Sequence, residues 1–201
     1  MRKLSKSFYQ RTDVLLIARE LLGKVLVSKL DSTVTAGRIV ECEAYDGIVD
    51  KASHAFAGRR TTRNEAMYAD AGTAYIYICY GIHHLFNVVT NEKNIPHAIL
   101  IRALDPVSGI EKMLERRKKK MPDHSLTKGP GSLSVAMGIS VKHNHYSLLS
   151  NRLYIADDGF KVREKDMLVS PRIGVASSGD AAIYPYRFFL KGNPFVSGKP
   201  K

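Results

Sequence analysis

Cysteine is scarce in this chain of 201 residues, which has only two, and neither belongs to a metal-binding motif. Cys42 and Cys79 fall in separate predicted strands, without the close spacing of cysteine and histidine that zinc sites require. A disulfide framework and a zinc centre are therefore not expected. Both side chains are predicted to be buried thiols.

Acidic residues are also few, with 19 Asp and Glu against 31 Lys and Arg, which leaves a net charge of +12. Such an excess favours a polyanionic partner, with nucleic acid as the first candidate and a membrane surface as the second. The length and the hydrophobic share of 44% fit one globular domain over residues 1–201. Its ends, residues 1–10 and 192–201, are expected to be loosely ordered.

Long apolar runs are missing as well, which argues against the membrane. No run approaches the roughly 18 apolar residues of a spanning helix, and no basic amphipathic helix has a broad apolar face. Residues 1–10 lack the apolar core of a signal peptide. We therefore expect no membrane association and a cytoplasmic, nucleoid-associated location.

The unusual residues concentrate between positions 38 and 87. Glu41 and Glu43 lie in a run that is otherwise typical of an apolar strand, where a carboxylate needs a partner or a function. Strand alternation predicts that Ile39, Glu41, Glu43 and Tyr45 share one face, with the intervening residues on the other. Glu43 then has three open interpretations, as a general base, a metal ligand or the partner of a buried cation.

A β-hairpin is predicted around Tyr80 and Gly81, because β-rich runs flank this turn-forming pair. Tyr80 then lies at an exposed tip, while Tyr77 and Asn87 lie back along the two arms and line a pocket at its base. Tyr80 fits a wedge between stacked bases, although a tyrosine at a hairpin tip is common. The two runs cover residues 75–80 and 84–90.

Basic side chains outside the hairpin occur in a predicted strand and in an irregular loop. Arg102 lies within a predicted strand, where a guanidinium is costly to bury unless an anion or carboxylate meets it. Arg59, Arg60 and Arg63 lie in an irregular loop beside hydroxyl and amide side chains, a mixture suited to phosphate oxygens. A solvated basic loop is an equally good interpretation.

The rest of the chain is predicted to be scaffold. A helix begins behind a cap at Thr12 or Asp13 and is closed by Gly23, and glycines also bracket a short helix that ends at Gly138. Further predicted elements are a strand at residues 24–30, a strand at 98–104, an amphipathic helix at 106–120, and short strands between 153 and 189.

Together the motifs ECEAY, AGTAYIYICYG, FNVV and IRALDP, with His54 nine residues after Tyr45, resemble the alkyladenine (3-methyladenine) DNA glycosylase family. The resemblance extends from LIARELLGKVLV through KGPGSLSVAMGI and SPRIGV to YRFFLKGNPFVS, and so covers nearly the whole chain. It implies a mixed α/β (α+β) single domain around a curved, largely antiparallel β-sheet with flanking helices.

The resemblance also implies a function, which is hydrolysis of the N-glycosidic bond of a damaged purine flipped out of double-stranded DNA. Expected lesions are 3-methyladenine, 7-methylguanine and hypoxanthine, and the enzyme is expected to be a monomer without metal or cofactor. A noncatalytic nucleic-acid-binding module and a nucleoside hydrolase are the competing hypotheses. The binding module leaves Glu43 unexplained, and the nucleoside hydrolase does not account for the net positive charge.

Residue roles follow from the same resemblance. Glu43 is similar to the base that deprotonates the attacking water, Arg102 to its companion, and the backbone carbonyl near Ile173 to a third ligand of that water. The other matched positions form two groups. The base-binding group is Tyr45, His54, Tyr77 and Asn87, the last of which disfavours guanine, and the DNA-binding group is Tyr80, Gly81, Arg59 and Arg63.

Overall fold

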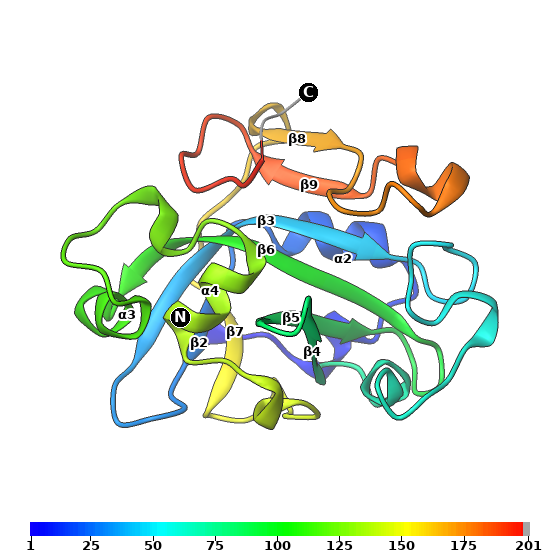
Figure 1. Cartoon of the computed structure of the whole chain (residues 1–201), viewed down its shortest axis with the longest axis horizontal. Helices are drawn as coiled ribbons and strands as arrows, with labels where there is room; N and C mark the ends of the chain where they lie inside the picture. Colours follow the sequence, from blue (N-terminus) through cyan, green and yellow to red (C-terminus); the bar gives the residue numbers. More distant parts are fainter. Residues whose placement is uncertain (199–201) are drawn as a thin grey trace.

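A single antiparallel sheet of nine strands organises the computed structural model, which describes residues 1–198 (Figure 1). The strand order is β1-β7-β2-β3-β6-β5-β4, and β9 pairs with both β3 and β8. The prediction of an α+β domain around a curved, largely antiparallel sheet is confirmed. The strands are β1 (Arg2–Lys3), β2 (Val25–Ser28), β3 (Thr35–Tyr45), β4 (Ala74–Cys79), β5 (His83–Thr90), β6 (His97–Ser108), β7 (Leu153–Asp157), β8 (Met167–Ser170) and β9 (Arg187–Leu190).

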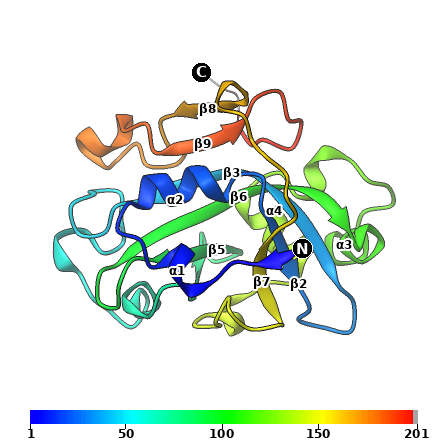
Figure 2. The same ribbon diagram turned by 180° about the vertical axis from the view of Figure 1, so that it is seen from behind.

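Short helices cover both faces of the sheet. Helix α4 lies on the same face as the β4–β5 hairpin in Figure 1, whereas Figure 2 shows α1 and α2 on the opposite face. The α-helices are α1 (Lys6–Tyr9), α2 (Val14–Leu21), α3 (Ile110–Arg117) and α4 (Pro130–Met137). The 3-10 turns are η1 (Phe56–Gly58), η2 (Glu65–Tyr68), η3 (His124–Leu126), η4 (Val141–His143), η5 (Glu164–Asp166) and η6 (Gly179–Ile183).

Two predicted helices form where their capping residues indicate. The Asp13 side chain accepts a hydrogen bond of 2.9 Å from the backbone N–H of Leu16, which satisfies a free donor at the start of α2. The apolar stripe of α2 is buried against the sheet. Helix α4 begins after Gly129 and ends at Gly138, whose φ of 70° suits glycine.

A β-bulge in β3 changes which residues face the core. The pairing of β3 with β6 shifts between Ile39 and Glu41, and Val40 is the extra residue. Ile39 packs in the main core with Cys42, while Val40 packs in a separate cluster on the other face. The prediction that Ile39 shares a face with Glu41 is therefore wrong. At this bulge β3 also leaves β2 and begins to pair with β9.

The helix predicted at residues 106–120 is shorter than expected. Residues 106–108 instead extend β6, where Pro106 pairs with Gly37 near the end of the strand. Gly109, at φ 73°, then separates strand from helix, and a Cβ there would lie 2.3 Å from the Val34 carbonyl oxygen. Helix α3 begins only after this glycine, because its left-handed backbone cannot continue either element.

Both ends of the described chain are packed, which differs from the loose order expected for them. Strand β1 pairs with β7, and Tyr9 is fully buried in the main core. Val196 and Ser197 are also buried, while residues 199–201 lie outside the described residues. Of the two thiols, Cys42 is buried as predicted, but Cys79 is only half-buried because it lies next to the hairpin tip.

Residues 1–198 contain neither a membrane-spanning helix nor a cluster of metal-binding side chains. None of the helices in this range is both long enough and apolar enough to cross a membrane. Likewise, these residues contain no group of three or more His, Cys, Asp or Glu side chains placed to hold a metal ion.

Candidate active site

One cavity, of about 380 Å³, brings the predicted site residues together at the base of the β4–β5 hairpin. Its walls come from β3, β4, β5, β6, the segment of residues 52–67 and the loop after residue 172. Glu43 lies buried beneath this lining. The predicted residues on the cavity wall are Tyr45, His54, Arg63, Tyr77, Tyr80, Asn87, Arg102 and Ile173.

A larger hollow, of about 680 Å³, lies between β1, α2 and residues 157–167. This hollow is large enough to hold a ligand, but its lining does not have the side chains expected of the predicted active site. Several of its charged side chains form ion pairs at the surface, as in the contacts of Lys24 with Asp157 at 2.9 Å and Arg19 with Glu164 at 3.2 Å. The smaller cavity, with a buried carboxylate beneath it, is therefore the candidate active site.

Glu43 is held by three groups. The Ile173 backbone N–H donates to its Oε1 at 2.7 Å, the Tyr45 hydroxyl donates to Oε2 at 3.0 Å, and Nη1 of Arg102 lies 3.3 Å from Oε1. Burial raises the pKa of Glu43 above its ordinary value, although these three contacts oppose the shift. A carboxylate whose pKa moves toward neutrality is better matched to accepting a proton.

Arg102 is held by a second carboxylate, Glu41. Its Nε donates to Glu41 Oε1 at 2.9 Å, and its Nη2 donates to the Ser197 hydroxyl at 3.1 Å. The prediction that this buried guanidinium needs a carboxylate is confirmed. Glu41 also accepts hydrogen bonds from Arg187 and from the backbone N–H of Ser197, at 2.8 and 2.6 Å.

The aromatic slot contains Tyr75 in addition to the predicted residues. The His54 and Tyr77 ring centroids are 4.6 Å apart at 74°, and Tyr75 lies 5.5 Å from Tyr77. The Tyr75 hydroxyl is 2.8 Å from Nδ1 of His54, and desolvation of the ring together with the nearby charges of Arg63 and Arg59 lowers the pKa of His54. Sequence analysis missed Tyr75, although alternation along the strand places it on the same face as Tyr77.

Asn87 lies opposite Tyr75 in the β4–β5 register and is buried in the cavity wall. Its Nδ2 donates to the carbonyl oxygens of Tyr75 and Leu85 at 3.1 and 3.2 Å. Because both amide hydrogens are engaged by the backbone, Oδ1 is the polar atom that remains for a ligand. These two hydrogen bonds fix the side chain in place.

The hairpin has the predicted form, with Tyr80 at its tip. Cys79 pairs with His83 across a three-residue turn, and Tyr80 adopts φ 50° with 89% of its surface exposed. Gly81 follows at φ 75°. A bulky residue in the left-handed region is costly, so the tip holds a strained conformation that presents the tyrosine ring to solvent.

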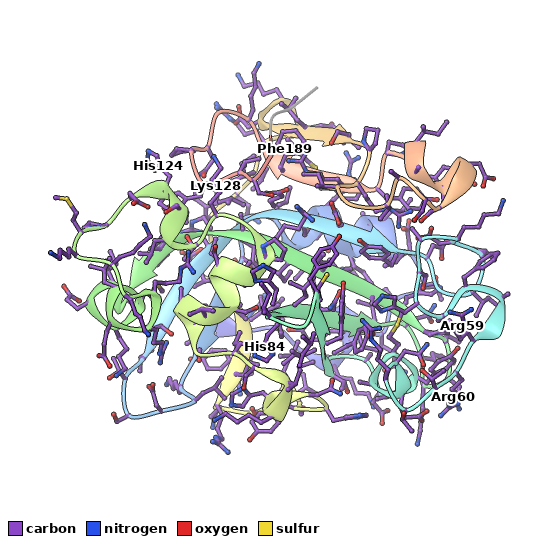
Figure 3. All side chains as sticks on the ribbon, in the orientation of Figure 1. Arg59, Arg60, His84, His124, Lys128 and Phe189 are labelled. Atoms are coloured by element: carbon purple, nitrogen blue, oxygen red, sulfur yellow. The ribbon has the colours of Figure 1, made fainter. Side chains whose placement is uncertain are left out.

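The basic loop divides between internal contacts and exposed charge. Arg60 donates to Glu65 at 2.5 Å, and Arg63 donates to the Ile78 carbonyl at 3.2 Å with its guanidinium 5.6 Å from the Tyr77 ring. Arg59 is exposed. Figure 3 shows Arg59 and Arg60 at one edge of the molecule. Arg60 is thus tied to the loop itself, and the exposed Arg59 lines a separate hollow that it shares with His54.

A buried ion pair behind the slot was missed by sequence analysis. Both terminal nitrogens of Arg172 donate to the Asp50 carboxylate, and Nη1 also donates to the Ala44 carbonyl at 2.8 Å. The guanidinium lies 4.7 Å from the Tyr45 ring. Arg172 immediately precedes Ile173, whose N–H holds Glu43, so the pair anchors one wall of the site. Nothing in the local sequence pattern connects positions 50 and 172.

Comparison with known proteins confirms the resemblance. The sequence profile of the methylpurine-DNA glycosylase (MPG) family matches residues 7–194. Relatives in Clostridium perfringens, Clostridium acetobutylicum and Bacillus cereus are provisionally named 3-methyladenine DNA glycosylase. They are 40%, 44% and 44% identical over 98%, 97% and 96% of this chain, and over 100%, 97% and 98% of their own lengths. The chain therefore belongs to the methylpurine-DNA glycosylase family.

Proposed function

We propose that this protein is a monofunctional DNA glycosylase that hydrolyses the N-glycosidic bond of alkylated or deaminated purines flipped out of double-stranded DNA. The observation that carries the proposal is the buried carboxylate of Glu43 beneath an aromatic cavity, at the base of a hairpin with an exposed Tyr80. Family membership supports the reaction class. A noncatalytic DNA-binding module would have no use for a buried carboxylate at this place.

The chemistry requires one base and one water molecule. Glu43 in its ionised form takes a proton from water, the water oxygen bonds to C1′ of the sugar, and the C1′–N bond breaks with its electron pair leaving on the purine. Arg102 holds Glu43 by its Nη1 and stabilises the ionised form. In this proposal the backbone carbonyl of Ile173 is a further ligand of the water, while its N–H fixes the carboxylate.

Base selection follows from the aromatic slot. An alkylated purine carries positive charge, which aromatic faces such as those of Tyr45 and Tyr77 attract by ~1 to 2 kcal/mol in a desolvated site. Because Asn87 is fixed by two backbone hydrogen bonds and cannot move aside, we propose that its side chain occupies the space that the exocyclic amine of guanine would need. We expect release of 3-methyladenine and hypoxanthine, and slower release of 7-methylguanine, which keeps that amine.

Flipping is proposed to depend on the hairpin tip. Tyr80 enters the stack and fills the gap that the flipped nucleotide leaves, and Gly81 lets the backbone approach the duplex. Extrusion costs a few kcal/mol and less for a poorly pairing lesion, so damaged bases are favoured before chemistry. Arg59 and Arg63 are proposed to contact phosphates, in line with the net charge of +12.

We also propose that the protein acts as a monomer on nucleoid DNA. Every residue with a proposed role comes from one chain, so the site needs no second copy. The reaction as written is balanced by water and a carboxylate, and it involves no metal or organic cofactor.

Release of free bases is the direct test. The purified protein is incubated with methylated DNA and with an inosine-containing duplex, and the freed bases are separated by chromatography. Release of 3-methyladenine with an intact sugar–phosphate backbone is expected. Binding of lesion DNA without any base release would favour the binding-module hypothesis, and release from free nucleosides that bulk DNA does not inhibit would favour a nucleoside hydrolase.

A further inference from the structure

The guanidinium of Arg102 is engaged at all three nitrogens. Its Nε donates to Glu41, its Nη2 donates to the Ser197 hydroxyl, and only Nη1 is directed to Glu43. The direction of Nη1 is therefore set by the two contacts that Nε and Nη2 make. One of these comes from the same sheet, and the other comes from the C-terminal segment.

Ser197 uses every polar group that it has in this network. Its backbone N–H donates to Oε2 of Glu41 at 2.6 Å, and its hydroxyl donates to Oε1 of Glu41 at 2.9 Å while accepting from Arg102. Its carbonyl accepts from Nη2 of Arg187 at 2.5 Å. A buried residue with all of its polar groups paired is held rigidly and can hold its partners in turn.

The next residue, Gly198, lies close to Ile173, the second residue that holds Glu43. Its φ is 71°, and a Cβ added there would lie 2.7 Å from Cδ1 of Ile173, the residue whose N–H donates to Glu43. Val196 anchors the segment in a small apolar cluster with Phe189. Ser197 thus contacts Arg102, and Gly198 lies close to the side chain of Ile173, although none of residues 196–198 lines the cavity.

We propose that residues 196–198 are a positioning segment of the active site, in which Ser197 aims Arg102 at Glu43 and Gly198 leaves room for Ile173. The inference rests on the proposed glycosylase function. Ser197 does not line the cavity, so its hydroxyl acts through the two side chains that it contacts, Arg102 and Glu41. Loss of its hydroxyl leaves Nη2 without a partner, so the guanidinium can turn and Nη1 can leave its place beside the carboxylate. Reacting groups that shift by a fraction of an ångström lose much of their rate.

The test compares Ser197→Ala with Ser134→Ala, a matched loss of a buried serine hydroxyl. The Ser134 hydroxyl bonds only the Pro130 carbonyl within α4, outside the site. Single-turnover base release, lesion-DNA affinity and the midpoint of thermal unfolding are measured for each variant. We expect Ser197→Ala to slow release by roughly 10-fold with unchanged affinity, and Ser134→Ala to release at the wild-type rate.

The outcomes separate the inference from the proposed function. No release by the wild-type protein overturns the function itself. If the wild type is active, an unchanged rate in Ser197→Ala overturns the inference, and so does a rate loss that Ser134→Ala reproduces. Ser197→Thr keeps a hydroxyl, so it should regain rate relative to Ser197→Ala.

Gly198→Ala is the second variant, for use if Ser197→Ala does not fold. It should slow release without weakening lesion binding, because a left-handed backbone at φ 71° disfavours alanine and the added methyl group would press on Cδ1 of Ile173. Wild-type release in this variant would also count against the positioning segment.

Discussion

Glu41 and Glu43 lie two residues apart on β3 and are both fully buried, yet their surroundings differ in kind. Glu41 accepts hydrogen bonds from Arg102, Arg187 and Ser197 and is saturated by them. Glu43 accepts one from a backbone N–H and one from a tyrosine hydroxyl, with Nη1 of Arg102 farther away. Glu41 thus acts as a fixed counter-charge, and Glu43 is the carboxylate suited to exchange a proton.

The first prediction concerns Glu43→Gln, which keeps the shape of the side chain but removes the base. Base release should fall by roughly 10²- to 10⁴-fold, the usual contribution of general-base catalysis. Lesion-DNA affinity should persist, because the aromatic slot and Tyr80 are unchanged. Single-turnover release and gel-shift titration on the same duplex measure the two effects. Retained turnover would mean that another group is the base.

The second prediction is the pH dependence of the rate. Burial raises the pKa of Glu43, and only the ionised form accepts a proton from water. Release should therefore fall as pH drops through this raised pKa, at a higher pH than for an exposed glutamate, which titrates near about 4.3. This fall is measured as the single-turnover rate between about pH 4 and pH 8, which covers roughly the range over which buried carboxyl groups titrate. An acid limb at the ordinary value would contradict the assignment.

The same shift predicts a stability effect of opposite sense. Because the folded-state pKa of Glu43 lies above the unfolded value, the folded protein binds more protons between the two values. The contribution of Glu43 to the free energy of unfolding is thus fully present below the ordinary pKa and is lost as pH rises through the raised one. Glu43→Gln should be more stable than the wild type at neutral pH. Urea unfolding of both proteins at several pH values measures this difference.

Local patterns predicted the parts of the site that are close in sequence. Alternation placed Tyr77 and Asn87 at the base of the hairpin and Tyr80 at its tip, because strand geometry repeats every two residues. Alternation alone left Glu41 and Glu43 equivalent. The structure distinguishes them through partners that lie far along the chain, and no periodicity reports such contacts.

The features that the sequence did not predict all depend on contacts between residues far apart along the chain. The bulge at Val40 adds one residue to a strand, and only the pairing with β6 and β9 reveals it. The pair between Asp50 and Arg172 joins two irregular segments separated by 122 positions. Ser197 reaches Glu41 across 156 positions from a segment expected to be loose. Contacts of this kind are fixed by the tertiary fold and not by the sequence around either residue.

The third prediction concerns Tyr80→Ala. Because Tyr80 is exposed, its loss should change the free energy of unfolding by no more than about 0.5 kcal/mol. The preference for lesion DNA over undamaged DNA should fall, since nothing then fills the gap in the stack. Met121→Ala, another exposed apolar residue outside the hairpin, is the control. Competitive binding of lesion and undamaged duplexes measures the preference, and an unchanged ratio would count against the wedge.

The last prediction concerns the buried pair of Asp50 and Arg172. Asp50→Asn leaves the guanidinium charged and uncompensated in the interior, which should cost about 3–5 kcal/mol of unfolding free energy. Combining it with Arg172→Met removes both charges, so the double variant should lose less than the sum of the two single losses. Urea unfolding of all four proteins tests this. Additive losses would mean that the two side chains do not stabilise one another. Release should also slow in Arg172→Met, because the neighbouring Ile173 N–H then holds Glu43 less firmly.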